Sequence, residues 1–179
     1  MSVNMRAFFL PENRDNEGQL AFYDSVTGLR THGPWRCLGK ASRTINGTPH
    51  TNTKLLPTLE FGNTPVGKFK VLGFKGPDDT SKYGLYPRLQ LVGISGDALI
   101  RENVANNTIR VHAGRVRPNG KLMVTLGCIR VDEPTMLIIY ETIIKLNIEF
   151  PFELIVEERE DIPLIVGCDP SQDADPSPV

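Results

Sequence analysis

The sequence predicts a mainly β domain that contains one substantial helix. Short segments in which apolar and polar residues alternate recur along the 179 residues, and stretches of Gly, Pro, Asn and Thr separate them. Apolar residues recur at helical spacing in one good candidate segment. The composition, with 40% hydrophobic and 23% charged residues, is that of a globular protein large enough to bury a core.

The first expected strands lie at residues 6–10 and 19–24, and we expect them to pair in an antiparallel arrangement. The turn-forming pair at residues 27–28 follows, after which the chain resumes. Residues 41–63 are rich in Thr, Asn, Gly and Pro, which predicts a long loop with little regular structure. A loop of that length is either functional or a plain surface connection.

Further strands are expected at residues 67–74, 88–92, 108–112 and 152–157. In the third of these, Ile109 and Val111 lie on one face of the strand. Arg110 and His112 alternate with them, so the His112 side chain points away from the aliphatic face.

The expected helix begins after Asp132, whose side chain can cap it, and Pro134 lies in the first turn, where a missing N–H costs nothing. Its apolar residues recur at helical spacing and predict core packing: Met136, Ile139, Ile143 and Leu146. We expect a single domain over residues 1–166 and a disordered tail over residues 167–179, where Pro, Ser and Asp are frequent.

Charge and composition exclude several function classes. The net charge of −1 predicts no basic field for nucleic acid or anionic lipid, and no apolar run reaches the roughly 18–20 residues of a membrane span. Three cysteines, Cys37, Cys128 and Cys168, do not form a disulfide framework or a CxxC pair, and we expect no metal and no cofactor. Cys37 is expected to be a small buried apolar residue.

One pair of residues predicts nucleophilic chemistry. Cys128 follows His112 by 16 residues (128 − 112), and turn-forming residues lie between them at Gly114, Pro118, Asn119 and Gly120. A hairpin there would return Cys128 beside His112. A thiol becomes a strong nucleophile when an imidazole takes its proton. Gly127 allows close approach of a substrate, and backbone N–H groups at Gly127 and Cys128 could hold an oxyanion.

The segments around this pair resemble the L,D-transpeptidases of the YkuD type. Residues 125–130, Thr-Leu-Gly-Cys-Ile-Arg, match that family's motif of Ser or Thr, any residue, Gly, Cys, an aliphatic residue and Arg or Asn, which follows a His. Residues 63–71 are similar to its Thr-Pro-x-Gly-x-Phe strand entry, and residues 20–24 are similar to its opening hairpin. The resemblance covers residues 6–157 in the family order.

The resemblance implies a β-sandwich-like catalytic domain with the cysteine at the end of a groove. It implies peptidoglycan stem peptides as substrate, with attack on the carbonyl of the third residue, a diamino acid, and loss of the terminal D-alanine. The acyl group would then pass to an amine, giving a crosslink or an exchange of D-amino acids, or to water, giving L,D-carboxypeptidase cleavage. The sequence does not distinguish these three outcomes.

The resemblance also implies a role for each site residue. Cys128 would be the nucleophile and His112 its base, and the backbone carbonyl of Ala113 would orient the imidazole. The N–H groups of Gly127 and Cys128 would form the oxyanion hole. Arg130 would bind a substrate carboxylate or brace the loop.

Thr125, Leu126 and Ala113 affect how the roles implied by the resemblance apply to this chain. Thr125 is counted with the substrate-binding residues, although its hydroxyl is as well suited to fixing the loop by hydrogen bonds. Many members have a second His where this chain has Leu126, so polar assistance from that position is absent. Ala113 replaces the commoner Gly or Ser, which a backbone role tolerates.

The resemblance implies action in the periplasm or cell envelope, yet residues 1–15 lack the apolar stretch of a Sec-type signal. Either a leader has been removed, or the protein stays in the cytosol, or it is exported without such a signal. Similar compact relatives are secreted antibacterial effectors, which implies a toxin with secretion machinery and an immunity protein as partners. The alternatives are an inactive peptidoglycan-binding domain of the same fold, a cysteine peptidase of another fold, and, least favoured, a zinc protein.

Overall fold

The computed structural model describes residues 2–11, 14–41, 43–45, 48–50, 56–59, 62–104 and 108–162. Within these ranges the strands are β1 (Val3–Phe9), β2 (Gly18–Asp24), β3 (Arg30–Cys37), β4 (Arg43–Ile45), β5 (Thr48–His50), β6 (Gly67–Lys75), β7 (Arg88–Ser95), β8 (Arg110–His112), β9 (Ile129–Arg130) and β10 (Phe152–Glu158). The helices are α1 (Thr80–Tyr83), α2 (Gly96–Glu102) and α3 (Glu133–Lys145). The mainly β class predicted from the sequence is confirmed.

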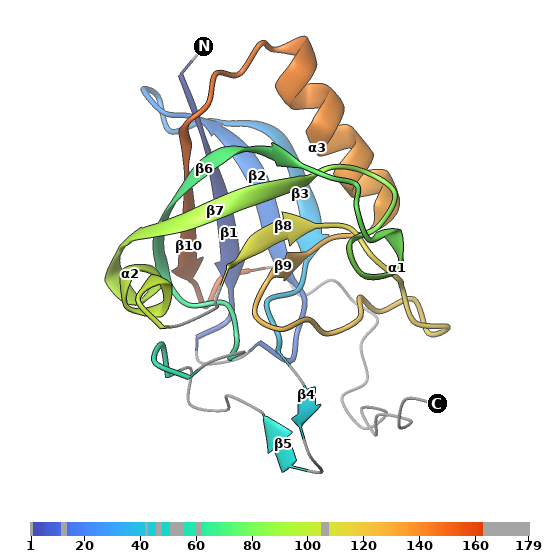
Figure 1. The fold of residues 1–179 in the computed structure, drawn as a ribbon. Helices are drawn as coiled ribbons and strands as arrows, with labels where there is room; N and C mark the ends of the chain where they lie inside the picture. The colour runs from blue at the N-terminus through green and yellow to red at the C-terminus, as the bar shows by residue number, and fades with distance from the viewer. Residues whose placement is uncertain are drawn as a thin grey trace.

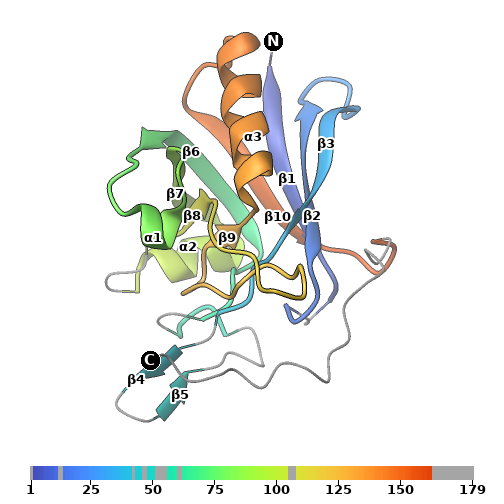
Figure 2. The ribbon, with the colours of Figure 1, turned by 90° about the vertical axis from the view of Figure 1, so that its right-hand side faces the viewer.

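Eight strands form one sheet in the order β3-β2-β1-β10-β6-β7-β8-β9. The expected pairing of the first two strands is confirmed, because β1 and β2 are antiparallel, while β10 returns from the far end of the chain to lie parallel to β1. In Figure 1, β6 and β7 pass in front of β1, β2 and β3, and Figure 2 places the two groups on opposite sides of the molecule. The sheet therefore curls so that its two halves face each other, like the layers of a sandwich.

A pair of backbone hydrogen bonds joins the two ends of the curled sheet. The N–H of Leu38, directly after β3, donates to the carbonyl of Arg130 in β9, and the N–H of Arg130 donates to the carbonyl of Leu38, both at 2.9 Å. Paired edges leave no unsatisfied backbone groups at this point. The closure also lies two residues from Cys128 and so fixes the position of that residue.

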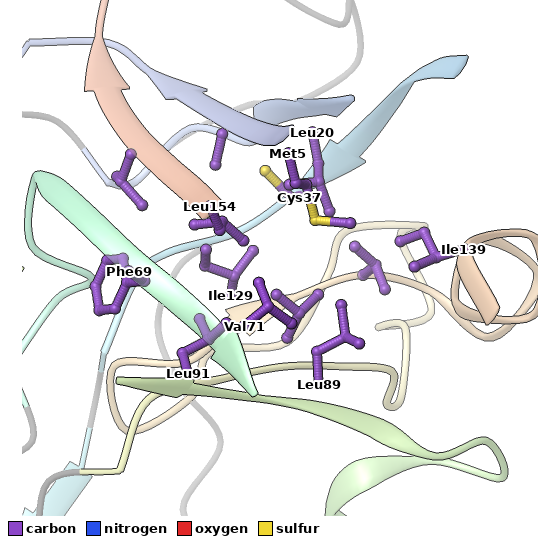
Figure 3. Close-up of a cluster of buried hydrophobic side chains, with 14 of the residues drawn as sticks. Met5, Leu20, Cys37, Phe69, Val71, Leu89, Leu91, Ile129, Ile139 and Leu154 are labelled. Carbon is purple, nitrogen blue, oxygen red and sulfur yellow. The ribbon is translucent and has the colours of Figure 1, made fainter. Parts of the chain in front are cut away.

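The hydrophobic core fills the space between the two halves of the sheet. Figure 3 shows side chains of β1, β2 and β10 on one side of the core and those of β6 and β7 on the other, with Ile129 of β9 between them. Alternation in β6 puts Phe69 and Val71 into this core, as predicted, while Lys68 and Lys70 are exposed. Cys37 is fully buried in the same cluster, which confirms its expected apolar role.

Two details of the sequence interpretation need correction. The stretch at residues 41–63, expected to be a long loop with little regular structure, contains the short antiparallel ladder of β4 and β5. Beside the expected helix there are two shorter ones, α1 and α2, and α2 packs on β6 and β7. The tail at residues 167–179 and Cys168 lie outside the described residues, so their predictions stay untested, as does the single-domain boundary at residue 166. In the described ranges, no helix is long and apolar enough to span a membrane.

Helix α3 begins as the sequence predicted. The Asp132 carboxylate accepts a hydrogen bond from the N–H of Thr135 at 2.9 Å, and Pro134 occupies the first turn. The other carboxylate oxygen of Asp132 pairs with the guanidinium of Arg36 at 3.0 Å, which connects the start of the helix to β3. Met136, Ile139 and Ile143 are buried in the core.

Asp132→Ala is expected to lower the free energy of unfolding by about 1–2 kcal/mol, because it removes the helix cap and one of the partners of Arg36. Asp132→Asn retains a capping oxygen and should cost less. Guanidinium denaturation monitored by circular dichroism measures both variants. Equal loss in the two would mean that the cap contributes nothing.

Candidate functional site

The candidate site is built on the last two strands of the sheet. Strands β8 and β9 are parallel, with Val111 beside Ile129 and His112 beside Arg130. Because side chains alternate along a strand, Val111 and Ile129 enter the core, and both are fully buried. Cys128, His112 and Arg130 share the opposite face, where they line one pocket. The structure therefore brings the two motif residues to the same face.

The connection between these strands corrects the expected hairpin. Parallel neighbours need a crossover of a dozen or more residues, and residues 113–128 form it. The chain reversal does occur within this crossover, where Val116 and Leu122 form an antiparallel bridge around a turn at residues 117–120. The predicted turn chemistry was correct, but it pairs two parts of the crossover rather than the strands that carry His112 and Cys128.

The turn before Cys128 is held by the Thr125 hydroxyl. This oxygen accepts from the N–H of Gly127 at 3.0 Å and lies 2.9 Å from the carbonyl of Cys128, to which it donates. The Thr125 side chain is therefore engaged in the loop, although it also touches the pocket. The N–H of Gly127, expected in the oxyanion hole, already has a partner. Among the contacts of the described residues, the N–H of Cys128 has none.

The Thr-Pro-x-Gly-x-Phe segment at residues 63–71 contacts the same turn through Thr64. Thr64 is fully buried and its hydroxyl donates to the carbonyl of Gly127 at 2.8 Å. Gly127 has φ +110°, and a Cβ there would lie 2.5 Å from the carbonyl oxygen of Gly62. Only glycine meets both conditions without strain. Arg101, also buried, donates to the Gly62 carbonyl at 3.1 Å and so supports the segment on which Gly127 rests.

The His112 ring has a defined tautomer. Its Nδ1 lies 2.5 Å from the carbonyl oxygen of Ala113. A carbonyl oxygen only accepts, so Nδ1 carries the hydrogen and Nε2 has a free lone pair. The ring also meets Tyr83 of α1 edge-on, with centroids 5.2 Å apart. These contacts hold a neutral imidazole that can accept a proton through Nε2.

Burial keeps both reactive groups neutral. Burial lowers the pKa of His112 to about 3, and the positive charge of Arg130 adds to the effect, while the hydrogen bond to Ala113 opposes it. Burial likewise raises the pKa of the Cys128 thiol, opposed by a hydrogen bond from the Arg110 backbone and by neighbouring guanidinium groups. An imidazolium–thiolate pair is thus disfavoured before substrate enters.

The Cys128 thiol does not touch His112 in this side-chain position. Its Sγ lies 4.0 Å from the carbonyl oxygen of Thr108, a weak contact, and the described residues include no hydrogen bond between Sγ and His112. Both side chains nevertheless line the same pocket of about 530 Å³. Hydrogen bonds between catalytic groups are often long or misaligned before substrate binds.

Arg130 lies deep in this pocket. Only 9% of the residue is exposed, and its guanidinium packs on Gly114, where a Cβ would lie 2.9 Å from Cζ. Its Nη2 donates to the carbonyl of Lys82 at 3.4 Å, and its buried Nε has no hydrogen-bond partner among the described residues. The arginine therefore braces α1 weakly and retains an unused donor at Nε.

The structure adds residues that the sequence interpretation missed. Arg110 lines the pocket and donates to the Tyr83 hydroxyl at 2.9 Å. The alternation of that strand placed Arg110 on the His112 face, but no motif assigned it to the site. Lys82 and Tyr83 come from α1, a segment with no motif signal. In the described part of the chain, no group of three His, Cys, Asp or Glu residues could hold a metal ion.

Thr125→Val is expected to lower the free energy of unfolding by about 1–3 kcal/mol, because the N–H of Gly127 and the carbonyl of Cys128 lose their partner. Thr125→Ser keeps the hydroxyl and should lose less. Chemical denaturation of the three proteins measures this difference. If Thr125→Val were as stable as wild type, the hydroxyl would not hold the turn.

The lowered pKa of His112 predicts a specific loss of stability in acid. An unfolded histidine titrates near its ordinary pKa of about 6.5, so the unfolded chain binds a proton that the folded site rejects until about pH 3. This histidine's contribution is complete above about pH 6.5 and falls by on the order of 4 kcal/mol as the pH drops toward 3. His112→Asn removes the titration while keeping a donor for Ala113.

The unfolding free energies of wild type and His112→Asn are measured between pH 7 and pH 3. Wild type should lose more stability than the variant as the pH falls. The other titratable groups are present in both proteins, so their contributions cancel in the difference between the two unfolding free energies. Parallel curves over this range would show that the imidazole is not held neutral.

The comparisons with known proteins concern the fold. No family model matches the chain, and no curated protein matches its sequence. The structure of Bdellovibrio bacteriovorus Bd1075 is similar over 87% of this chain and 47% of that chain, with a TM-score of 0.50 and 12% identity. An L,D-transpeptidase from Mycobacterium smegmatis aligns over 87% of this chain and 58% of its own, with a TM-score of 0.38 and 13% identity.

This chain thus spans about half the length of the solved structures that it matches. At 12% identity, the likeness to Bd1075 shows a common fold and nothing of the chemistry.

Proposed function

We propose that the protein is a cysteine acyltransferase that acts on peptidoglycan tetrapeptide stems. One observation carries the proposal: the Cys128 thiol and the His112 imidazole line a single pocket on one face of the parallel pair β8 and β9. The match of residues 125–130 to the L,D-transpeptidase motif supplies the reaction and the substrate class.

In the proposed first step, the Cys128 thiol leaves the Thr108 carbonyl and attacks the carbonyl carbon of the third stem residue. As the S–C bond forms, the thiol proton passes to Nε2 of His112, which is free because Nδ1 donates to Ala113. Since burial disfavours both charged forms, we propose that proton transfer accompanies attack and does not precede it.

The tetrahedral intermediate then collapses. Its C–N bond breaks, His112 returns the proton to the leaving amine, and D-alanine departs from a thioester on Cys128. The N–H of Cys128, which has no partner among the described residues, is the donor that we propose for the oxyanion. The N–H of Gly127 instead fixes the turn through Thr125.

An acceptor then resolves the thioester. An amine gives a crosslink or an exchanged D-amino acid, and water gives the tripeptide. His112 takes the proton of the attacking group in each case and returns it to the cysteine sulfur. Because the substrate belongs to the cell wall, the proposal places the action in the cell envelope. The toxin role, the immunity protein and the secretion machinery stay predictions.

The test is product analysis of purified tetrapeptide muropeptides incubated with wild type and with Cys128→Ala. Wild type should remove or exchange the terminal D-alanine or build dimers, and the variant should lose at least about 10³-fold in rate, as expected when a covalent nucleophile is removed. His112→Asn should be similarly impaired. The ratio of products identifies the dominant activity.

Two outcomes would contradict the proposal. Unaltered muropeptides with wild type would favour the inactive binding domain of the same fold. Full activity in Cys128→Ala would exclude the thioester. Thermal melts of all three proteins show whether each variant is folded, so that loss of activity is not confused with loss of structure.

A further inference from the structure

The pocket has a charge that the chain as a whole does not have. Among the residues that the structure describes, its lining includes the cations Lys82, Arg110, Arg115 and Arg130 and no aspartate or glutamate, whereas the net charge of the whole chain is −1. Lys82 pairs with Asp79 at 3.0 Å, so the three arginines supply the excess positive charge of the pocket. A cleft lined by charges of one sign attracts ligands of the opposite sign.

The three arginines of the pocket lack carboxylate partners within the described residues. Arg110 donates to two neutral hydroxyls, those of Tyr83 at 2.9 Å and Thr108 at 3.4 Å. Arg130 has a weak contact with a backbone carbonyl, and its buried Nε has no partner. Arg115 is exposed at the pocket and makes no ion pair there.

By contrast, several arginines outside the pocket, three of which follow, each pair with a carboxylate. Arg14 pairs with Glu158 at 2.9 Å, Arg36 pairs with Asp132 at 3.0 Å, and Arg159 pairs with Asp161 at 2.6 Å. Three guanidinium groups that share a pocket without a counter-charge repel one another. A bound anion would relieve that repulsion and form charge-assisted hydrogen bonds with them.

We propose that this pocket selects stems with more than one free carboxylate around the bond that is cleaved. This inference rests on the proposed function. The C-terminal D-alanine supplies one carboxylate in every tetrapeptide stem. A diaminopimelate third residue with a free side-chain carboxylate supplies a second, whereas lysine or amidated diaminopimelate at that position does not. Arg115 is the specificity-determining residue that we assign to the difference, because it is exposed and unpaired.

The experiment compares three synthetic tetrapeptides that differ in the third residue: diaminopimelate with a free carboxylate, its amide, and lysine. The expected kcat/KM is about 10–100-fold higher for the free acid, the range typical of a charge-assisted contact. Arg115→Gln should reduce this ratio severalfold, chiefly by raising KM for the free acid. Arg30→Gln, which removes the same charge from the exposed start of β3, should preserve the ratio.

The outcomes distinguish a failure of the proposed selectivity from a failure of the proposed acyl transfer. Equal turnover of the three peptides would overturn the selectivity while leaving acyl transfer intact. A ratio unchanged in Arg115→Gln would overturn the assignment to Arg115. No turnover of any peptide by folded wild type would overturn the proposed function and this inference with it.

Discussion

The site depends on the backbone pair between Leu38 and Arg130, which closes the curled sheet. Strand β9 has two residues, too few to hold its place alone, and it is fixed by β8 on one side and by Leu38 on the other. Cys128 directly precedes β9, so its position follows from this closure. One face of the same strands lines the pocket, and the opposite face completes the core through Ile129.

Burial and the neighbouring positive charges shift the pKa values of both reactive groups, His112 and Cys128. The guanidinium groups oppose protonation of His112 and favour the thiolate of Cys128, while burial opposes charge on either. The balance is a neutral pair at rest. A neutral thiol avoids the non-productive alkylation and oxidation that a permanent thiolate would undergo. An anionic substrate would partly cancel the field of the arginines and so raise the basicity of the imidazole as it binds.

How much was predictable from sequence depends on how local each feature is. Alternation located β6 and β8, and the Asp132 cap located α3, because each depends on neighbours in the chain. Cys128 and His112 were singled out by a motif shared with a known family, and the structure places both side chains in one pocket. The closure, the parallel register of β8 and β9, and the contact of Thr64 with Gly127 join residues distant in sequence, and no local pattern encodes them. The cationic pocket could not be predicted either, because its lining residues come from distant segments and the net charge of −1 describes only the chain as a whole.

The central claim is that Cys128 forms a thioester with the stem peptide, and intact-mass spectrometry tests it most directly. Protein is incubated briefly with a tetrapeptide stem, quenched in acid and weighed, and the adduct is located by peptide mapping. The account predicts a mass increase equal to the stem without its terminal D-alanine, less one water, on the peptide that contains Cys128. Product formation with an adduct on another residue, or with full turnover in Cys128→Ala and no adduct at all, would contradict it.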